Sequence, residues 1–218
     1  MPETTRIGIV DADKDIRMGR KLLLTSLSDV EVVFDSDGAS SDLESIQRSL
    51  IDVLLIDQKL ASGPGVGFYS SLRELTGIKD APSAVITTSY IQPALLLEAL
   101  EAGAFDVVAV EQGAKALIDT VTSVTKGSNA YALSELKNLL TTQSQIRVVD
   151  LNLVSLIDQL PEKLASNLRR LKSVWRKEDV SKLEQYKLSA LDDLVARLPV
   201  ANATELVLAL NRSGLLDE

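Results

Sequence analysis

The chain has 218 residues, 45% of them hydrophobic and 25% charged, which is the balance of a folded globular protein with one large domain or two small ones. It contains no cysteine and no histidine. Disulfides, thiolate nucleophiles, the usual zinc ligands and the commonest general base are therefore excluded. No apolar run approaches the roughly 20 residues that span a bilayer, and the first residues do not have the pattern of a signal peptide, so we expect a cytoplasmic protein.

The net charge of −8 is unevenly distributed along the chain. Residues 1–125 carry 19 acidic and 10 basic side chains, whereas residues 126–218 carry 12 acidic and 13 basic ones. Within the second part, the stretch 163–187 holds eight bases and three acids. This asymmetry predicts two domains with different partners.

The first 125 residues alternate short apolar runs with amphipathic helical patterns. We expect strands at 6–11, 30–34, 53–57, 83–88 and 106–110. We expect helices at 14–27, 40–50, 67–75, 93–102 and 114–125. Five strand–helix units predict an α/β domain, a five-stranded doubly wound parallel sheet of flavodoxin-like order, over residues 1–125.

After residue 126 only helical patterns remain. They cover 132–142, 151–160, 161–175, 177–185, 188–198 and 203–212. Short helices joined by tight turns are typical of helix-turn-helix domains. We therefore expect a linker with one helix at 126–150, followed by a small all-α domain at 151–218.

Two of the predicted strands lead into an aspartate, Asp11 after the first and Asp57 at the end of the third. In a flavodoxin-like sheet these strands are neighbours, so both carboxylates are expected at one crevice, with Asp13 close by. Clustered carboxylates favour a bound cation, and Mg²⁺ prefers oxygen ligands. Each acid also has a plainer interpretation: Asp57 as a residue that ends a strand and caps a turn, and Asp13 as the N-cap of the first helix.

Hydroxyl groups follow at the same predicted edge, because the fourth strand ends in Thr87 and Thr88. They could hydrogen-bond an added phosphoryl group, or they could be ordinary β-branched strand residues. Together with Asp11 and Asp57 they define the candidate site.

The motifs along residues 1–125, taken in chain order, resemble those of the receiver domain of bacterial two-component response regulators. The resemblance rests on Ile-Val-Asp11, on Leu-Leu-Ile-Asp57, on Gly65 eight residues further on, on Thr87 five residues past Pro82, and on Ala102-Gly-Ala104. It covers residues 1–125 and implies that Asp57 accepts a phosphoryl group from a histidine kinase. It also implies Mg²⁺ beside Asp57, held by Asp11 and Asp57 with Asp13 as a third candidate, and a switch hydroxyl at Thr87 or Thr88.

The sequence departs from that family at several positions. The second of two adjacent acids is replaced by Ala12, and the lysine and proline that usually end strand five are replaced by Val110 and Glu111. The aromatic position within that strand is Val107, and the usual proline after the acceptor is Ala61. Phosphoryl transfer needs its charge neutralised, so a receiver that signals by another route, or is locked in one state, is the alternative.

The end of the chain, residues 191–216, is similar to the end of LuxR-type helix-turn-helix domains of the NarL/FixJ group. The resemblance makes 188–198 the helix presented to the major groove. That stretch contains Asp192 and Asp193 but only one base, whereas DNA affinity comes from Lys and Arg. The candidate DNA contacts are Arg169, Arg170, Lys172, Arg176, Lys177, Lys182, Lys187 and Arg197.

Two functions follow from these resemblances. The first is an atypical response regulator, a dimeric transcriptional regulator that binds DNA through its C-terminal domain and is modulated by phosphorylation or a ligand. The second is a signalling adaptor in which a pseudo-receiver carries a helical tail that binds a protein. In either case the basic helices could be ordinary solvated faces, Trp175 is expected in a core, and the chain is not expected to be an enzyme.

Overall fold

The computed structural model describes residues 4–128, 130–143, 150–176 and 180–216. The chain divides into two compact units, Met1–Ala130 and Tyr131–Glu218. The helix expected within the linker, α6 (Leu133–Thr142), belongs to the second unit. Residues 144–149 of that expected linker lie outside the described part of the chain. None of the described helices is both long and apolar enough to cross a bilayer.

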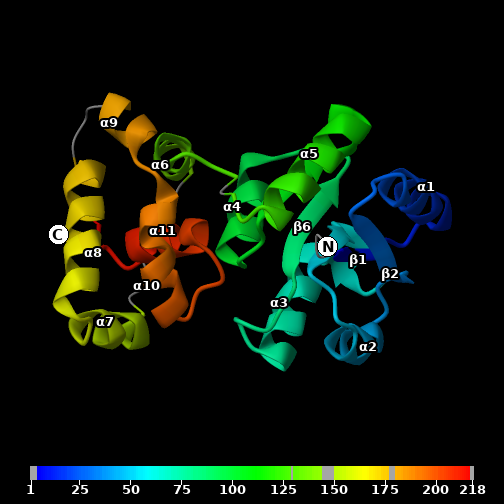
Figure 1. Ribbon diagram of the computed structural model, residues 1–218, viewed down its shortest axis with the longest axis horizontal. Coiled ribbons are helices and arrows are strands. Elements are labelled where there is room, and N and C mark those ends of the chain that lie inside the picture. The colour runs from blue at the N-terminus through cyan, green and yellow to red at the C-terminus, as the bar shows by residue number, and fades with distance from the viewer. Residues whose placement is uncertain (1–3, 129, 144–149, 177–179, 217–218) are drawn as a thin grey trace. The chain divides into compact units, whose positions relative to one another are not determined.

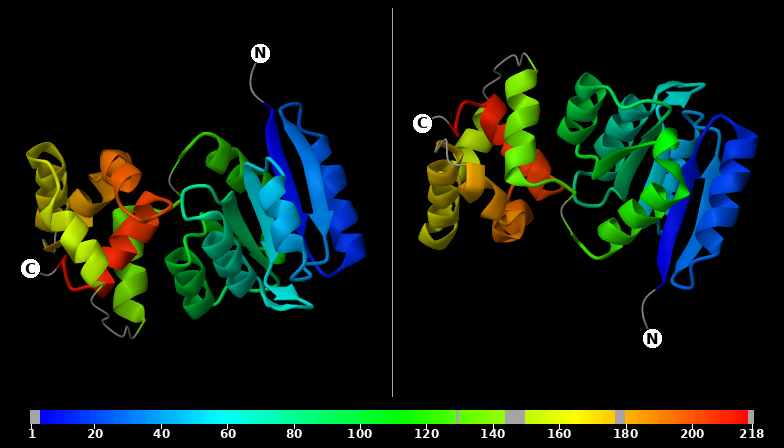
Figure 2. Two further views of the ribbon diagram at one scale, coloured as in Figure 1. Left: turned by 90° about the horizontal axis from the view of Figure 1, so that it is seen from below. Right: turned by 90° about the horizontal axis from the view of Figure 1, so that it is seen from above.

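The first unit is built on a parallel five-stranded sheet in the order β2-β1-β3-β6-β7. Its strands are β1 (Thr5–Val10), β2 (Val30–Ser36), β3 (Val53–Asp57), β6 (Ser83–Thr88) and β7 (Asp106–Ala109). The edge strand β2 and its neighbour β1, both drawn in blue, run side by side in Figure 2. The central strands are apolar on both faces, as a sheet covered by helices on both sides requires. The flavodoxin-like prediction is confirmed.

Helices cover both faces of this sheet (Figure 1). One face packs against α1 (Lys14–Thr25) and α5 (Gly113–Thr125), around Ile7, Ile9, Leu55 and Val85. The other face packs against α2 (Asp42–Arg48), α3 (Gly65–Thr76) and α4 (Pro93–Glu101). Alternate residues of each strand point to opposite faces, so one strand supplies both cores. The predicted three-layer arrangement places all strand carboxyl ends at one edge.

Two local features differ from the sequence-based expectations. A small hairpin, β4 (Lys59–Leu60) with β5 (Gly63–Pro64), follows β3 and was not expected. The last strand ends at Ala109, and Val110 opens a 3₁₀ turn, η1 (Val110–Gln112). The Gln112 side chain accepts a hydrogen bond from the Ala109 N–H at 2.7 Å. This bond ends the strand one residue earlier than its apolar run suggests.

The second unit is entirely helical in its described residues. After α6 come α7 (Leu151–Asp158), α8 (Glu162–Arg176), α9 (Val180–Gln185), η2 (Leu188–Leu191), α10 (Asp192–Arg197) and α11 (Ala203–Arg212). On α8, Leu164, Leu168, Leu171 and Trp175 are buried at helical spacing, so the prediction that Trp175 is a core residue is confirmed. Residues 177–179, expected at the start of α9, are outside the described part.

The stretch expected as one helix at 188–198 is divided into a 3₁₀ turn, η2, and the six-residue α10. Leu188, Leu191 and Leu194 are all buried. Their spacing of three residues suits a 3₁₀ turn, in which residues i and i+3 eclipse. The expected helix is therefore helical almost throughout, with a 3₁₀ first turn, and its role in reading DNA stays a prediction.

Tyr186 lies between α9 and η2, is only 8% exposed, and carries a buried hydroxyl without a hydrogen-bond partner in the described structure. The guanidinium carbon of Arg170 lies 6.0 Å from the centre of its ring. Burial raises the pKa of Tyr186 above its ordinary value, and the Arg170 charge partly opposes this shift. The phenol is thus held in its neutral form at the cost of a buried, unsatisfied group.

Tyr186→Phe should raise the free energy of unfolding at pH 7 by about 1 kcal/mol, because it removes that unsatisfied hydroxyl. Wild-type protein should lose stability as the pH rises from about 10 through the higher folded-state pKa, since the folded state then retains a proton that the unfolded state releases. The variant lacks this loss, so its advantage should grow in alkaline buffer. Urea unfolding at pH 7 and at a pH above about 10 tests this. Tyr90→Phe, at an exposed position, is the control. A variant less stable than wild type at neutral pH would contradict it.

Candidate functional site

The Asp57 carboxylate lies at the carboxyl edge of the sheet, at the end of β3. Its Oδ1 accepts a hydrogen bond from the Lys59 N–H at 2.8 Å, and its Oδ2 accepts one from the Thr87 hydroxyl at 3.3 Å. Thr87 comes from β6, where it is paired in register with Asp57. The Asp57 side chain remains 19% exposed. The structure therefore brings the predicted acceptor and one predicted hydroxyl together at an edge that solvent can reach.

Asp11 follows β1 and is almost completely buried, with 4% of its surface exposed. Its Oδ1 accepts a hydrogen bond from the Asp13 N–H at 2.8 Å. Burial raises the pKa of the Asp11 carboxyl above its usual range, while the Asp13 N–H and the Arg20 guanidinium act in the opposite direction. Strand order places Asp11 beside Asp57, as expected from β1 and β3 being neighbours.

Arg20, on α1, is the residue of this site that sequence reasoning missed. It is 8% exposed. Its Nη1 lies 2.6 Å from Asp11 Oδ2, and its Nη2 lies 3.6 Å from Asp57 Oδ2. A guanidinium thus bridges the two predicted metal ligands. The available signal was its position four residues after Ile16 and three before Leu23, which puts a charge on the apolar stripe of α1.

Two other predicted site residues have different contacts. Asp13 is the N-cap of α1, and its Oδ1 accepts hydrogen bonds from the N–H groups of Asp15 at 2.8 Å and Ile16 at 3.2 Å, the plainer interpretation considered for it. The Thr88 hydroxyl donates to the Tyr90 carbonyl at 3.2 Å, and Thr88 follows Thr87 on a strand, so it points to the opposite face. The structure therefore places Thr87, and not Thr88, against Asp57, and it gives Asp13 the role of a helix cap.

Two positions that depart from the family pattern supply neither the usual second carboxylate nor the usual lysine. Ala12 is exposed and has no carboxylate, and Val110 is 55% exposed. Beside Arg20 and Thr87 lies a cavity of about 240 Å³ with mostly apolar walls that include Val110 and Leu117. Arg20 is therefore the cation that the structure places against Asp57.

Gly65 is needed because the backbone at this position passes close to the carbonyl group of Asp57. A Cβ at this position would lie 2.2 Å from the Asp57 carbonyl oxygen and 3.0 Å from Ile56 Cγ2. Because the first neighbour is backbone, it cannot yield without moving the end of β3. The glycine quoted for the family resemblance thus has a steric reason to be there.

Gly65→Ala should lower the free energy of unfolding by about 1–3 kcal/mol, the range for forcing an extra methyl group into a packed site. The matched control is Gly67→Ala two residues along α3, where an added Cβ meets no atom within 4 Å. This control should stabilise by about 0.5–1 kcal/mol, because alanine favours helix. Thermal unfolding of both variants tests the contrast, and equal effects would show that the close approach is not restrictive.

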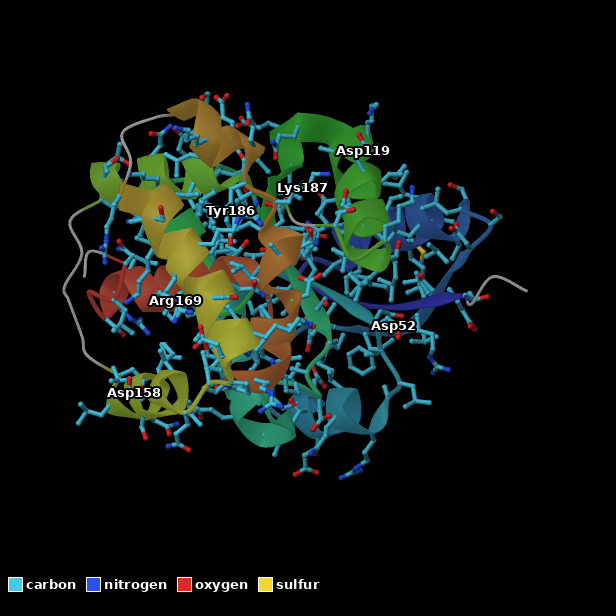
Figure 3. The ribbon with its side chains drawn as sticks, turned by 60° about the vertical axis from the view of Figure 1, so that its left-hand side comes forward. Asp52, Asp119, Asp158, Arg169, Tyr186 and Lys187 are labelled. Carbon is cyan, nitrogen blue, oxygen red and sulfur yellow. The ribbon has the colours of Figure 1, made fainter. Side chains whose placement is uncertain are left out.

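The basic residues predicted to contact DNA lie, where the structure describes them, on α8, α9 and α10 and just before η2. Figure 3 labels Arg169 on α8 and Lys187 just before η2. Several bases have partners within the second unit: Arg169 with Glu162, Arg170 over the Tyr186 ring, and the Arg176 Nε donating to the Leu216 carbonyl at 3.4 Å. Exposed or partly exposed bases also include Lys172, Lys182, Lys187 and Arg197, while Lys177 lies outside the described residues.

Comparison with known proteins identifies the first unit. A family model described as the response regulator receiver domain matches residues 7–122. Among curated proteins, the response regulator protein VraR of Staphylococcus aureus is 22% identical over 148 residues, which cover 66% of this chain and 68% of VraR. The family model therefore spans the whole candidate site.

Solved structures give a similar result. The receiver domain of the putative response regulator NarL from Mycobacterium tuberculosis matches with a TM-score of 0.52 and 25% identity, covering 58% of this chain and 99% of that domain. The response regulator RcsB from Salmonella typhimurium matches with a TM-score of 0.56 and 16% identity, covering 94% of this chain and 100% of RcsB. The likeness of fold thus extends through the helical unit. The chain belongs to the family of response regulators with a receiver domain.

Proposed function

We propose that the chain is an atypical response regulator of the cytoplasm that controls transcription by binding DNA through its C-terminal helical unit. The observation that carries the proposal is the hydrogen bond between Thr87 and Asp57 at the carboxyl edge of a receiver sheet. A helical unit follows this sheet in the same chain. The similar RcsB structure describes conformational dynamism for DNA interaction in that response regulator. The family is one of regulators, and this supports a regulatory role for the present chain.

The input proposed for the receiver is the occupancy of Asp57. A phosphoryl group from a histidine kinase, or another ligand at the same edge, would engage the Thr87 hydroxyl and shift the population between two states of β6 and α4. One of these states would free the helical unit to form a homodimer on DNA. Asp57 is the proposed acceptor because its carboxylate is partly exposed, whereas that of Asp11 is buried.

Mg²⁺ is the cofactor that receiver domains typically hold at this acidic edge. The residues present here do not fit it well. Ala12 supplies no carboxylate, Asp13 caps α1, and the two remaining carboxylates share Arg20. Among the described residues, no group of three or more acidic side chains is placed to hold a metal ion. The proposed function therefore does not depend on a bound metal.

An adaptor that binds a protein is the second candidate, and the form of α10 favours it. This helix has six residues, and both side chains at its start, Asp192 and Asp193, are acidic and exposed. Asp193 also lies 3.6 Å from the Nζ of Lys163, at the base-rich α8. Exposed carboxylates repel the phosphates of DNA, so α10 is a poor reading helix as it stands.

DNA binding by the full chain separates the two candidates. The affinity of the full chain for DNA fragments should fall as the salt concentration rises. Replacing Lys172 and Lys187 together by Gln should make the slope of log K against log salt shallower by about 2, because each lysine would neutralise one phosphate. Matched controls are Lys14→Gln and Lys59→Gln, exposed bases of the first unit. Absent binding, or an affinity indifferent to salt, would rule out the DNA-binding role and favour the adaptor.

A further inference from the structure

We propose that Arg20 takes the place of the divalent cation in this receiver, so that the acidic edge is neutralised by the protein itself and excludes Mg²⁺. The inference deepens the proposed function and rests on it only for the role of Asp57 as the centre of the switch. It concerns which cation the site uses, which can be measured without DNA.

The two carboxylates at this edge are already surrounded by hydrogen-bond donors. Asp11 Oδ1 accepts from the Asp13 N–H at 2.8 Å and Asp11 Oδ2 from Arg20 Nη1 at 2.6 Å. Asp57 Oδ1 accepts from the Lys59 N–H at 2.8 Å, and Asp57 Oδ2 from the Thr87 hydroxyl at 3.3 Å. All four oxygens therefore face proton donors. Mg²⁺ requires near-octahedral oxygen ligands at about 2.0–2.1 Å, so it would compete with these donors for the same oxygens.

The charge at this edge is already partly neutralised. Two carboxylates carry two negative charges, and Arg20 returns one positive charge from within the protein. Arg20 is only 8% exposed, so water screens its charge little. A divalent ion between the same carboxylates would meet a buried like charge at short range. The guanidinium and the metal are therefore mutually exclusive occupants of this edge.

Arg20 also supplies the positive charge that the family pattern takes from its lysine and from the metal that its second acid helps to hold. The pattern has a second acid where this chain has Ala12 and a lysine where it has Val110. Ala12 is exposed at the start of the loop before α1, and Val110 lies in η1. One arginine from α1 can provide this positive charge, because it lies 3.6 Å from Asp57 Oδ2 while it pairs with Asp11. In this arrangement Arg20 neutralises an anion at Asp57 without a metal.

Metal titration of the full chain tests the proposal. Mg²⁺ would be added to ¹⁵N-labelled wild-type protein and to the variants Ala12→Asp, Arg20→Met and Ala12→Asp/Arg20→Met, following the amide signals of residues 11–13 and 57–59. We expect no saturable shifts at those amides in wild type or in Ala12→Asp. The double variant, which restores the acid and removes Arg20, should bind Mg²⁺ at least about tenfold more tightly than wild-type protein or Ala12→Asp.

Three results would overturn the proposal. They are saturable Mg²⁺ binding at Asp57 in wild type, binding by Ala12→Asp as tight as by the double variant, and failure of the double variant to bind. Ala12 is exposed, so its replacement should not prevent folding. If the Arg20 variants do not fold, the two proteins that retain Arg20 decide the matter, because absence of binding by Ala12→Asp shows that the missing acid is not the reason. Loss of DNA binding would leave these results unchanged, so failure of the proposed function is a distinct outcome.

Discussion

Arg20→Met is expected to lower the free energy of unfolding at pH 7 by about 3–5 kcal/mol, the range for removing one partner of a buried ion pair. The guanidinium and the Asp11 carboxylate are both more than nine-tenths buried, and their closest atoms are 2.6 Å apart. Without Arg20, the Asp11 carboxylate keeps the bond from the Asp13 N–H as its compensation for burial among the described residues. Urea unfolding of the variant and wild type measures the difference.

The neighbouring residue supplies the control. Lys21 on the same helix pairs with Asp35 at 3.0 Å, and both side chains are more than two-fifths exposed, so Lys21→Met should change stability by no more than about 1 kcal/mol. The double variant Asp11→Asn/Arg20→Met should recover part of the loss, because no uncompensated charge remains. An Arg20→Met effect as small as that of Lys21→Met would contradict a structural role for the buried pair.

The pH dependence provides a second measure of the same ion pair. The pKa of Asp11 is raised in the fold, so between its ordinary value and the folded value the native state binds more protons than the unfolded state. Its contribution to stability therefore falls as the pH rises through that window. Removing Arg20 removes a charge that lowers this pKa, so the deficit of Arg20→Met should be largest at pH 7 and should shrink in acid, where Asp11 is neutral.

The strands and the meeting of Asp11, Asp57 and Thr87 could be predicted from the sequence for a simple physical reason. Each strand is a short apolar run of the kind that a covered parallel sheet requires. Once the strand order is flavodoxin-like, residues at the ends of β1, β3 and β6 must meet at one edge. The prediction needed only local patterns and one topological rule, and β3, β6 and α11 match their expected bounds.

Arg20, η1 and the divided 188–198 stretch could not be predicted in the same way. The role of Arg20 depends on how α1 is rotated against the sheet and on how far a long side chain reaches across nine residues to Asp11. The end of β7 depends on one side-chain bond from Gln112 to the backbone. The 3₁₀ turn at Leu188 depends on packing against the rest of the second unit. All three are set by tertiary contacts, which the sequence pattern does not specify.

Asp57→Asn is expected to abolish phosphoryl acceptance completely. In the wild-type reaction a carboxylate oxygen of Asp57 attacks the phosphorus of a small phosphodonor such as acetyl phosphate, a new O–P bond forms, and the bond to the acetate oxygen breaks with its electron pair. The amide of asparagine has similar shape and can still accept the Lys59 N–H bond, but it is not a comparable nucleophile. Intact mass of the full chain should show one added phosphoryl group in wild type and in the control Asp35→Asn, and none in Asp57→Asn.

The DNA affinity of the full chain before and after treatment with the phosphodonor, at one fixed salt concentration, tests the proposed regulation most directly. If Asp57 controls the helical unit, the two affinities should differ by a coupling of about 1–3 kcal/mol, which is roughly 5- to 150-fold. Asp57→Asn should bind DNA with the same affinity in both conditions. Wild-type protein that gains the phosphoryl group and binds DNA unchanged, or that binds no DNA in either condition, would contradict the claim that occupancy of Asp57 sets the output of this regulator.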